Sequence, residues 1–210
     1  MPGSAELALL LERPVLDVAP RLLGALVSHA GVTVRLTELE AYDGANDPGS
    51  HAYRGRTARN ATMFGPAGHV YVYFTYGMHY CANVVCGPDG TASAVLLRAG
   101  EVVAGIEVAR DRRGGARDRD LARGPARLCQ ALGLDTSHDG MSLAGPELVL
   151  RPRSRRVARG LVSTGPRVGL RLAADRPWRF WLTGEPTVSA YRPAVERTTR
   201  RRVDDGGGTE

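Results

Sequence analysis

The sequence predicts a single mixed α+β domain over residues 1–202, followed by a disordered tail at 203–210. Three observations support this prediction. The chain has 210 residues, 43% of them hydrophobic, which suits one domain with a sizeable core. Apolar residues recur at helical spacing near the N-terminus, whereas later apolar segments are short and rich in β-branched and aromatic residues. The last residues, VDDGGGTE, are too polar to join a core.

Two helices are expected at the N-terminus, over residues 5–12 and 14–29. Pro14 suits the first turn of a helix, and Pro20 should kink or restart the second one. One face of the second helix collects its apolar side chains: Val15, Val18, Ala19, Leu22, Leu23, Leu26 and Val27. Gly31 should end this helix, so that a strand follows at once.

The segment 32–42 alternates between apolar and other residues, as a half-buried strand does. Its apolar face begins with Val32, Val34 and Leu36. In a regular strand Glu38 and Glu40 continue that same face. A carboxylate on a core face is costly unless it is paired or lies in a cleft. Two interpretations stay open: a functional cleft at the end of the strand, or a bulge that turns both carboxylates outward.

A long polar segment over residues 43–68 and a hairpin over residues 69–86 come next. Long loops inside a compact domain are often functional. Gly77 permits a positive φ, so a tight turn is expected at Tyr76-Gly77-Met78. A tyrosine at such a tip has little to pack against, and an exposed ring there suits stacking on nucleic-acid bases. The alternative for the other tyrosines of this region is packing within the core.

In the second half of the chain we expect one helix, with strands and loops on either side of it. A strand over 94–97 should end at Arg98, and a mobile charged loop is expected over 109–124. A helix should run from 124 to 132, because a proline favours its first turn and Gly133 favours its C-terminal cap. Further strands are expected at 148–150, 168–172 and 178–183. The basic segment 151–159 is expected to be a loop that either meets phosphates or is simply solvated.

The charge and the residue types exclude several classes of protein. A net charge of +6 and a pI near 9.7 favour a polyanionic partner. The chain contains no lysine, so no lysine amine is available for a Schiff base. No apolar run reaches the length of a membrane span, and Glu6 and Glu12 stand where a secretory signal would be basic. Cys81, Cys86 and Cys129 lack the spacing of a disulfide framework, which predicts reduced, mostly buried thiols in a cytoplasmic protein.

Asp43, Asp47 and His51 are spaced four residues apart, so on a helix they would line one face and could bind a metal. The glycine and proline residues between them disfavour a helix, so we expect no metal and no cofactor. No phosphate-binding loop, dinucleotide fingerprint or nucleophile elbow is present in the sequence.

The remaining polar and aromatic residues suit chemistry on a nucleic-acid base. A carboxylate at the end of a strand can activate water. Aromatic side chains can sandwich a flat ring, an amide can read its edge, and arginines can hold phosphates. Together these parts suit an enzyme that flips a base out of DNA and hydrolyses its glycosidic bond. The competing hypothesis is a non-catalytic nucleic-acid-binding module, for example one that binds RNA through its sheet, and it predicts no special need for Glu40.

Several motifs, in order from about residue 5 to about residue 192, resemble one known family. They are ELEAY at 38–42, HAYRGRT at 51–57, RN at 59–60, MFG at 63–65, YVYFTYGM at 71–78, Asn83, AVLLRA at 94–99, GPARLCQALGL at 124–134 and PWRF at 177–180. This pattern resembles the alkyladenine (3-methyladenine) DNA glycosylase family. The resemblance implies a monofunctional enzyme, acting as a monomer on double-stranded DNA. It would release alkylated or deaminated purines of the 3-methyladenine and hypoxanthine class and leave an abasic site.

The same resemblance implies roles for particular residues. Glu40 corresponds to the general base that activates water, and Arg98 to an arginine near that water and the DNA backbone. The base pocket would contain Tyr42, His51, Tyr73 and Asn83. The first three contact the flipped base, and the asparagine excludes guanine through its exocyclic amine.

The hairpin would be the DNA-binding element of such an enzyme. Tyr76 would enter the minor groove and fill the gap left by the flipped nucleotide, next to Gly77 and Met78. Tyr71 belongs to the same motif, with a less defined role. The implied fold is a curved antiparallel sheet with a protruding hairpin, similar to the C-terminal domain of methionyl-tRNA formyltransferase. The chain departs from the family at Arg127, where bacterial relatives usually have lysine, and at 99–102.

Overall fold

The computed structural model describes residues 2–153 and 157–194. This part of the chain contains four α-helices: α1 (Pro2–Leu11), α2 (Val15–Leu22), α3 (Ile106–Arg112) and α4 (Pro125–Leu132). Its strands are β1 (Leu26–His29), β2 (Val32–Tyr42), β3 (Val70–Thr75), β4 (His79–Val85), β5 (Ala94–Ala104), β6 (Ala122–Arg123), β7 (Leu148–Arg151), β8 (Val162–Gly165) and β9 (Arg179–Leu182). Short 3-10 helices are η1 (Gly44–Asn46), η2 (Ala58–Phe64), η3 (Asp118–Asp120), η4 (Thr136–His138) and η5 (Arg159–Leu161).

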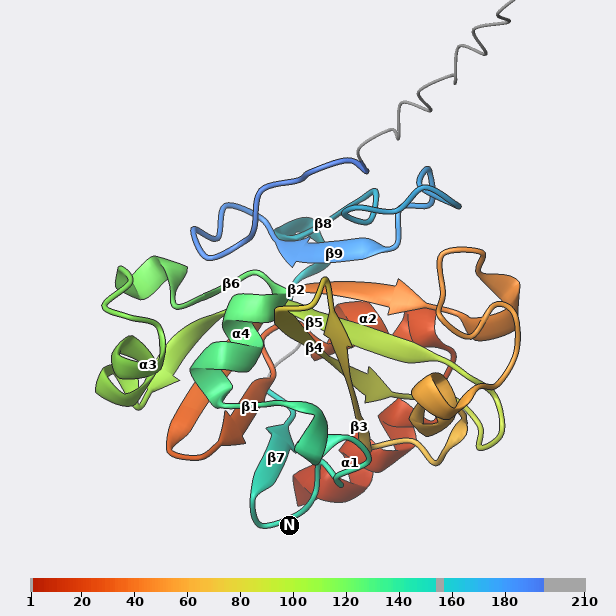
Figure 1. Ribbon diagram of the computed structural model, residues 1–210, viewed down its shortest axis with the longest axis horizontal. Helices are drawn as coiled ribbons and strands as arrows, with labels where there is room; N and C mark the ends of the chain where they lie inside the picture. The colour runs from red at the N-terminus through yellow and green to blue at the C-terminus, as the bar shows by residue number, and fades with distance from the viewer. Residues whose placement is uncertain (1, 154–156, 195–210) are drawn as a thin grey trace, which may run out of the picture.

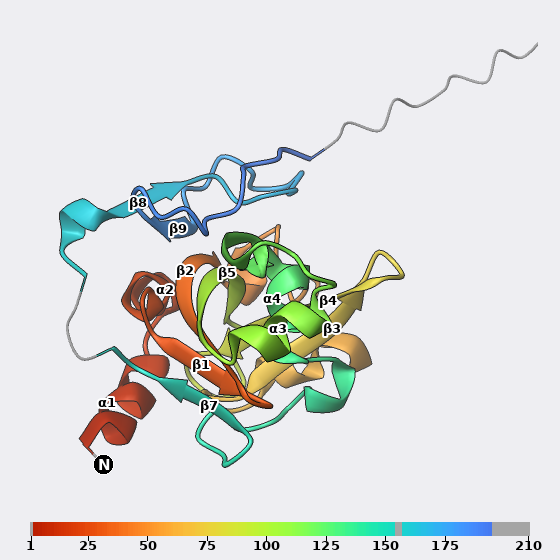
Figure 2. The ribbon, with the colours of Figure 1, turned by 90° about the vertical axis from the view of Figure 1, so that its left-hand side faces the viewer.

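The strands form a large, open antiparallel sheet, whose main path in space is β3-β4-β5-β2-β1-β7. β6 pairs with β5, and the β8–β9 hairpin joins through β9 to the second half of β2. In both Figure 1 and Figure 2, α1 and α2 lie on one side of the molecule and α3 and α4 on the other. The curved sheet and its flanking helices confirm the predicted α+β fold with an antiparallel sheet.

The second of the two N-terminal helices is shorter than predicted. α1 is close to the expected segment, but α2 ends at Leu22, whereas a helix was predicted as far as residue 29. Gly24 adopts a positive φ of 79° and turns the chain, and residues 26–29 form β1 instead. β1 pairs with β2 on one side and with β7 on the other, so pairing with distant strands overrides the helical spacing. Pro20 lies inside the last turn of α2 and does not restart the helix.

Two bulges place the carboxylates of β2. In the pairing of β2 with β5, Thr37 is an extra residue on β2 and Arg98 is an extra residue on β5. The extra residue on β2, Thr37, reverses the alternation of side chains between the two faces of the strand. Leu39 therefore continues the core face, and Glu38 and Glu40 point to the other face. Glu38 and Glu40 are nevertheless fully buried. The predicted strand is confirmed, although it is not regular. The bulge of the second interpretation is present, but it does not expose the carboxylates.

The predicted hairpin is confirmed as β3 and β4, with its turn at residues 76–78. It projects away from the rest of the molecule in Figure 2. The polar segment at 43–68 is largely irregular, as expected, but includes η1 and η2. The three cysteines are free and buried, as predicted.

The second half of the chain is predicted well at α4, β7 and β9, and less well elsewhere. Gly133 ends α4 with a positive φ of 72°, as expected of a C-terminal cap. β5 continues to residue 104, beyond its predicted end at Arg98. The stretch 109–124 was expected to be a loop but contains the end of α3, η3 and β6. The strand expected at 168–172 was wrong, because these residues form a turn and β8 lies earlier in the chain.

Two predictions fall partly or wholly outside the described residues. These are the tail at 203–210 and positions 154–156 of the basic segment. Within residues 2–153 and 157–194, none of the helices has both the length and the apolar character needed to cross a bilayer.

Candidate active site

A cavity of about 310 Å³ lies between the β3–β4 hairpin, the segment that follows β2, and the turn at 168–170. It brings together most of the residues predicted for the site: Tyr42, His51, Tyr71, Tyr73, Tyr76, Asn83 and Arg98. The rest of the lining was not predicted: Gly49, Met63, Thr75, Cys81, Leu96, Pro125, Val168, Gly169 and Leu170. Glu40 is absent from this lining and lies behind it.

Aromatic rings form one wall of the cavity. His51 and Tyr73 meet edge to face with their ring centroids 4.6 Å apart, and the rings of Tyr71 and Tyr73 are 5.4 Å apart. His51 Nδ1 lies 3.3 Å from the Tyr71 hydroxyl. The guanidinium of Arg59 lies 5.8 Å from the centre of the Tyr73 ring. These contacts fix the orientation of the rings relative to one another.

Burial keeps the titratable groups of this wall neutral. It raises the pKa of Tyr71 to about 12 and the pKa of Tyr42 well above its ordinary range. It also raises the pKa of Tyr73. Burial and the nearby charge of Arg59 lower the pKa of His51. At neutral pH the wall therefore presents uncharged phenols and an uncharged imidazole.

Glu40 is fully buried, and its carboxylate is bonded by groups that themselves line the cavity. The Tyr42 hydroxyl donates to Oε2 over 2.9 Å, and the Val168 N–H donates to Oε1 over 2.7 Å. Arg98 Nη1 lies 3.4 Å from Oε2, longer than the roughly 2.8 Å of an ordinary charge-assisted hydrogen bond. The residues that bond this carboxylate therefore separate it from the cavity. Of its hydrogen bonds to them, the one from Arg98 is the longest.

Glu38 holds Arg98 in position from the other side. Its carboxylate accepts hydrogen bonds from Arg98 Nε at 2.7 Å, Arg179 Nε at 2.8 Å and the Ser189 N–H at 2.7 Å. Burial alone would raise the pKa of Glu38, but Arg98 and Arg179 outweigh it and lower that pKa. Arg98 thus lies between two carboxylates, which raise its pKa against the opposing effect of burial.

A second buried ion pair supports the cavity from behind Tyr42. Arg167 and Asp47 are both fully buried, and the guanidinium donates to both carboxylate oxygens of Asp47. The same guanidinium stacks 4.6 Å from the Tyr42 ring centre and 5.1 Å from that of Trp178. Sequence reasoning missed Arg167, because a single arginine carries no local signal of a partner 120 residues away. Asp47 was considered only as a metal ligand.

The tip of the hairpin is exposed and strained. Tyr76 is 85% exposed and Met78 is 67% exposed. Tyr76 adopts a φ of 52° and Gly77 a φ of 68°, and the Met78 N–H closes the turn on the Thr75 carbonyl at 3.2 Å. A left-handed conformation costs a tyrosine about 1 kcal/mol or more. An exposed aromatic residue held in such a conformation marks the tip as a candidate binding element.

The remaining predicted residues take these positions. Asn83 is buried, and its amide donates to the Tyr71 carbonyl at 3.1 Å, which orients it at the cavity. Tyr71 was grouped with the DNA-binding residues of the hairpin, but only 1% of it is exposed and it forms part of the cavity wall. Within the described part of the chain no three His, Cys, Asp or Glu side chains are grouped as metal ligands.

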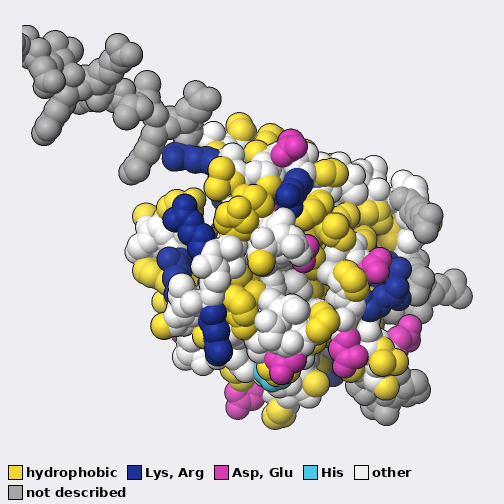
Figure 3. Space-filling model, turned by 90° about the vertical axis from the view of Figure 1, so that its right-hand side faces the viewer, with side chains coloured by type: hydrophobic (Ala, Val, Ile, Leu, Met, Phe, Trp, Pro, Cys, Tyr) yellow, Lys and Arg dark blue, Asp and Glu magenta, His cyan; other side chains and the backbone are white. Residues whose placement is uncertain are grey.

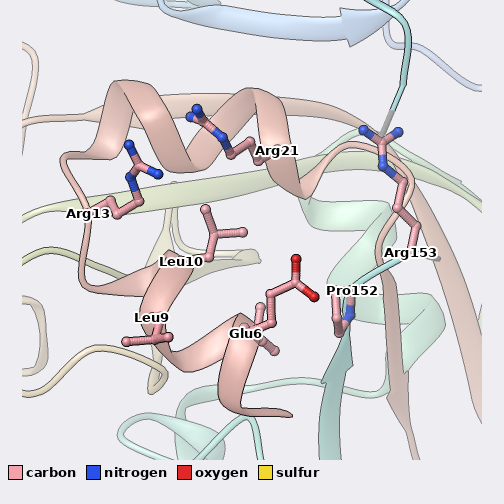
Figure 4. Close-up of a pocket in the computed structure, with 8 residues that line it drawn as sticks. Glu6, Leu9, Leu10, Arg13, Arg21, Pro152 and Arg153 are labelled. Carbon is pink, nitrogen blue, oxygen red and sulfur yellow. The ribbon is translucent and has the colours of Figure 1, made fainter. Parts of the chain in front are cut away.

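Another cavity, of about 210 Å³, lies beside α1 and α2 and contains none of the predicted site residues. Figure 4 shows Arg13 and Arg21 on one side of it and Glu6 on the other. Arg13 and Arg21 each pair with Asp17. Nothing about this cavity resembles the aromatic pocket.

The fold and the site define an α+β protein with an aromatic-walled cavity next to a buried carboxylate–guanidinium pair. Comparison with known proteins identifies the family. The model of the methylpurine-DNA glycosylase family matches residues 9–186, and the chain belongs to this family.

Curated relatives cover most of the chain. A relative in Streptomyces avermitilis is 56% identical over 90% of this chain and 92% of its own length. One in Frankia casuarinae is 54% identical over 87% of this chain and 91% of its own. One in Mycobacterium tuberculosis is 49% identical over 89% of this chain and 94% of its own length. All three are provisionally named 3-methyladenine DNA glycosylases.

Proposed function

We propose that this chain, as a member of a family of DNA glycosylases for alkylated bases, is a monofunctional enzyme of base excision repair. It flips an alkylated or deaminated purine out of duplex DNA into the aromatic cavity and hydrolyses the N-glycosidic bond, which leaves an abasic site. It acts as a monomer in the cytoplasm. The observation that carries the proposal is the fully buried Glu40, whose hydrogen-bond donors among the described residues all line the cavity.

In this reaction Glu40 acts as the general base. A water molecule enters from the cavity at the long Arg98–Glu40 contact of 3.4 Å. Its oxygen bonds to C1′ of the flipped nucleotide, and its proton passes to the Glu40 carboxylate. The glycosidic bond breaks, and its electron pair leaves with the base. A purine alkylated at a ring nitrogen is cationic and leaves as a neutral molecule, so it needs little help from an acid. A neutral lesion such as hypoxanthine needs a proton donor as well.

The cavity favours a cationic or neutral purine over an anion. Tyr42, His51 and Tyr73 are held uncharged by burial, and electron-rich ring faces attract a cation. Asn83 is fixed by its hydrogen bond to the Tyr71 carbonyl, so its amide meets the edge of the base in one orientation. This arrangement supports discrimination against guanine, whose exocyclic amine an ordered amide can exclude.

Tyr76 offsets the cost of flipping. Extruding a nucleotide costs a few kcal/mol. An aromatic ring in the vacated stack contributes about 1–3 kcal/mol. The exposure of Tyr76 at a projecting hairpin tip supports this role. Basic side chains run down the left side of Figure 3. Figures 2 and 3 are opposite views, so this is the right side of Figure 2, where the hairpin projects.

The test is release of a purine from a duplex that contains one hypoxanthine or one alkylated adenine. Wild-type protein should release the base, and Glu40→Gln should bind the duplex but lose at least a hundredfold in single-turnover excision, as loss of a general base predicts. Near-wild-type excision by Glu40→Gln would contradict the assignment.

Glu38→Gln is the comparison variant, because this carboxylate is equally buried but holds Arg98 and Arg179. It should lower thermal stability, since removing one partner of a buried ion pair costs about 3–5 kcal/mol. Its excision rate should fall less than that of Glu40→Gln when both are measured below their unfolding transitions. A wild-type protein that binds the duplex without releasing a base would instead favour a non-catalytic binding module.

A further inference from the structure

The buried ion pair between Arg167 and Asp47 joins two segments that line the aromatic cavity. Asp47 lies between Tyr42 and His51, and Arg167 directly precedes the turn at 168–170. Residues of both segments line the cavity, but Arg167 and Asp47 themselves do not. The pair therefore holds the two segments together from behind the cavity.

The guanidinium of Arg167 is fixed at the end of β2, beside Tyr42. Its Nη1 donates to the Ala41 carbonyl at 2.9 Å, and its Nη2 donates to Asp47 Oδ1 at 2.7 Å. The same carboxylate oxygen accepts the Gly49 N–H at 3.0 Å. With these bonds in place, the guanidinium lies 4.6 Å from the centre of the Tyr42 ring. A cation and an aromatic face attract each other more strongly when water is excluded, as it is here.

Arg167 thereby controls two hydrogen-bond donors of Glu40. The Tyr42 hydroxyl donates to Oε2, and the Val168 N–H donates to Oε1. The first donor belongs to the ring that stacks on Arg167, and the second belongs to the next residue in the chain. A general base acts only when its carboxylate is within hydrogen-bond reach of the proton that it takes. A displacement of Arg167 would move both donors and turn the carboxylate.

One atom of Arg167 argues against a purely stabilising role. Within residues 2–153 and 157–194, Arg167 Nε is the only buried side-chain nitrogen or oxygen that lacks a hydrogen-bond partner. Such atoms are rare in native proteins, and each needs an explanation. A buried ion pair is itself weak evidence for stability, because apolar replacements are often as stable. The guanidinium leaves one donor unsatisfied while its face stays on Tyr42, which favours a role in placing this ring.

We propose that Arg167, held by Asp47, is a positioning residue for the excision reaction. It keeps the Tyr42 hydroxyl on Glu40, and so keeps the carboxylate oriented for taking a proton from water. This proposal rests on the proposed function, because it takes Glu40 as the general base. Arg167 is fully buried and does not line the cavity, so its loss should slow the chemical step without weakening DNA binding.

The experiment separates positioning from stability with a charge-neutral double variant. Arg167→Gln alone leaves Asp47 buried without its partner and should lower the melting temperature strongly. Asp47→Asn added to Arg167→Gln removes the second charge and should recover most of that stability. Single-turnover excision of alkylated adenine by the double variant should stay about tenfold to a hundredfold below wild type, as a small displacement of a catalytic group predicts. Wild-type excision by the folded double variant would mean that the pair only stabilises the fold.

DNA binding is measured with a duplex that contains a tetrahydrofuran abasic analogue, which the enzyme cannot hydrolyse. The double variant should bind this duplex as tightly as wild type. Weaker binding that accounts for the whole loss of excision would overturn a role in the chemical step.

Arg167→Lys keeps the proposal testable if the double variant does not fold. The lysine keeps a positive charge beside Asp47 but lacks the flat face that stacks on Tyr42. Its melting temperature should be closer to wild type than that of Arg167→Gln, whereas its excision should be as slow as that of the double variant. Wild-type excision by Arg167→Lys would show that the flat guanidinium face is not needed.

Arg35→Gln is the matched control, because it removes an arginine from another ion pair. Arg35 Nη2 lies 2.8 Å from Glu185 Oε2, and neither residue lines the aromatic cavity. This variant should lower the melting temperature but keep wild-type excision below its unfolding transition. A loss of excision as large as that of the double variant would mean that any broken ion pair slows the reaction.

The route through Tyr42 is tested by combining substitutions. Tyr42→Phe removes the hydroxyl and keeps the ring. If Arg167 acts through this hydroxyl, the combined variant should lose less excision than the product of the separate losses, since groups that act as a unit are not additive. Losses that multiply in full would overturn this route.

A measurement without catalysis completes the test. NMR follows the exchange of the Tyr42 hydroxyl proton with water, which reports its hydrogen bond to Glu40. Exchange should be faster in the double variant and in Arg167→Lys than in wild type and Arg35→Gln. Unchanged exchange together with wild-type excision overturns the positioning role and leaves the proposed function intact. Faster exchange in these variants, when wild-type protein releases no base, supports the placement of Tyr42 by Arg167 and overturns the proposed catalysis.

Discussion

His51 is the residue of the cavity wall whose charge is most sensitive to pH near neutrality. Burial and Arg59 hold its pKa below the ordinary value of about 6.5. The folded protein therefore binds this proton less readily than the unfolded chain does. Stability that is fully present above about pH 6.5 should be lost as the pH falls below that value.

The measurement is the free energy of unfolding in urea for wild type and His51→Gln at several pH values on both sides of about 6.5. The glutamine variant has no proton to gain at this position. The difference between the two proteins should be constant at the higher pH values and shift against wild type at the lower ones. A difference that does not change with pH would contradict the lowered pKa.

Tyr76 is the second residue whose role can be tested alone, because it is exposed and its loss removes little packing. Tyr76→Ala should leave the melting temperature nearly unchanged and lower the flipped population by about tenfold, as the loss of one stacking contact predicts. Fluorescence of a base analogue at the lesion reports the flipped fraction. Tyr76→Phe retains the ring and should retain most of the flipping. Equal flipping in wild type and Tyr76→Ala would mean that the ring does not fill the stack.

At the scale of elements, the two opposed bulges explain how one strand pair carries both core side chains and the proposed catalytic ones. Thr37 and Arg98 are each left without a pairing partner in the β2–β5 register. The first bulge returns Leu39 to the core and moves both glutamates to the opposite face. The second allows Arg98 to reach both carboxylates. Bulges next to active sites often redirect side chains in this way.

The close approach of the two strands beside the first bulge gives a prediction. Gly100 pairs with Leu36, and a Cβ at Gly100 would lie 2.3 Å from Val34 Cγ1 and 2.5 Å from the Arg35 carbonyl oxygen. Gly100→Ala should therefore destabilise the fold by about 1–3 kcal/mol or more, since the backbone cannot yield cheaply.

Gly160→Ala is the matched control for Gly100→Ala. A Cβ at Gly160 would meet no atom of the described residues within 4 Å, and the φ of Gly160 is not in the left-handed region. Chemical denaturation should show a stability close to wild type for this variant. If Gly100→Ala were as stable as Gly160→Ala, the approach of β5 to β2 would have to be looser than the structure indicates.

At the scale of the whole molecule, buried carboxylates join segments far apart in the sequence. Glu38 binds the Ser189 backbone 151 residues away, and Asp47 binds Arg167 120 residues away. The C-terminal segment thereby covers the carboxylate face of β2. The ion pair between Asp47 and Arg167 explains how the turn near residue 168 comes to contact Glu40.

The absence of lysine from the entire chain leads to a prediction about the product. A glycosylase that also cuts the strand by β-elimination needs an amine that forms a Schiff base with the sugar. We expect an intact abasic site, because water is the nucleophile. Lesion duplex is incubated with enzyme and borohydride and then run on a denaturing gel. A trapped protein–DNA adduct, or strand breaks without alkali, would overturn this expectation and point to the secondary amine that Pro2 would have if Met1 were removed.

Local patterns were sufficient for several parts of the fold and the site. The β3–β4 hairpin, its Tyr76-Gly77 turn and the capped helix α4 follow from turn chemistry, alternation and caps within a few residues. The motif residues of the cavity were named from the sequence, and the structure places most of them around one space. Their catalytic and binding roles stay predictions until the variants are measured.

Other features depended on partners that lie far away in the sequence. Residues 26–29 carry a helical pattern, yet they form β1 because β2 and β7 offer hydrogen-bonding edges on both sides. The bulge at Thr37 and the buried ion pair between Arg167 and Asp47 likewise need strands and loops that meet only after folding. The sequence by itself determined which chemical groups were available and where the local turns lie. Only the tertiary structure decided which of those groups meet, because burial and strand pairing are set by the whole chain.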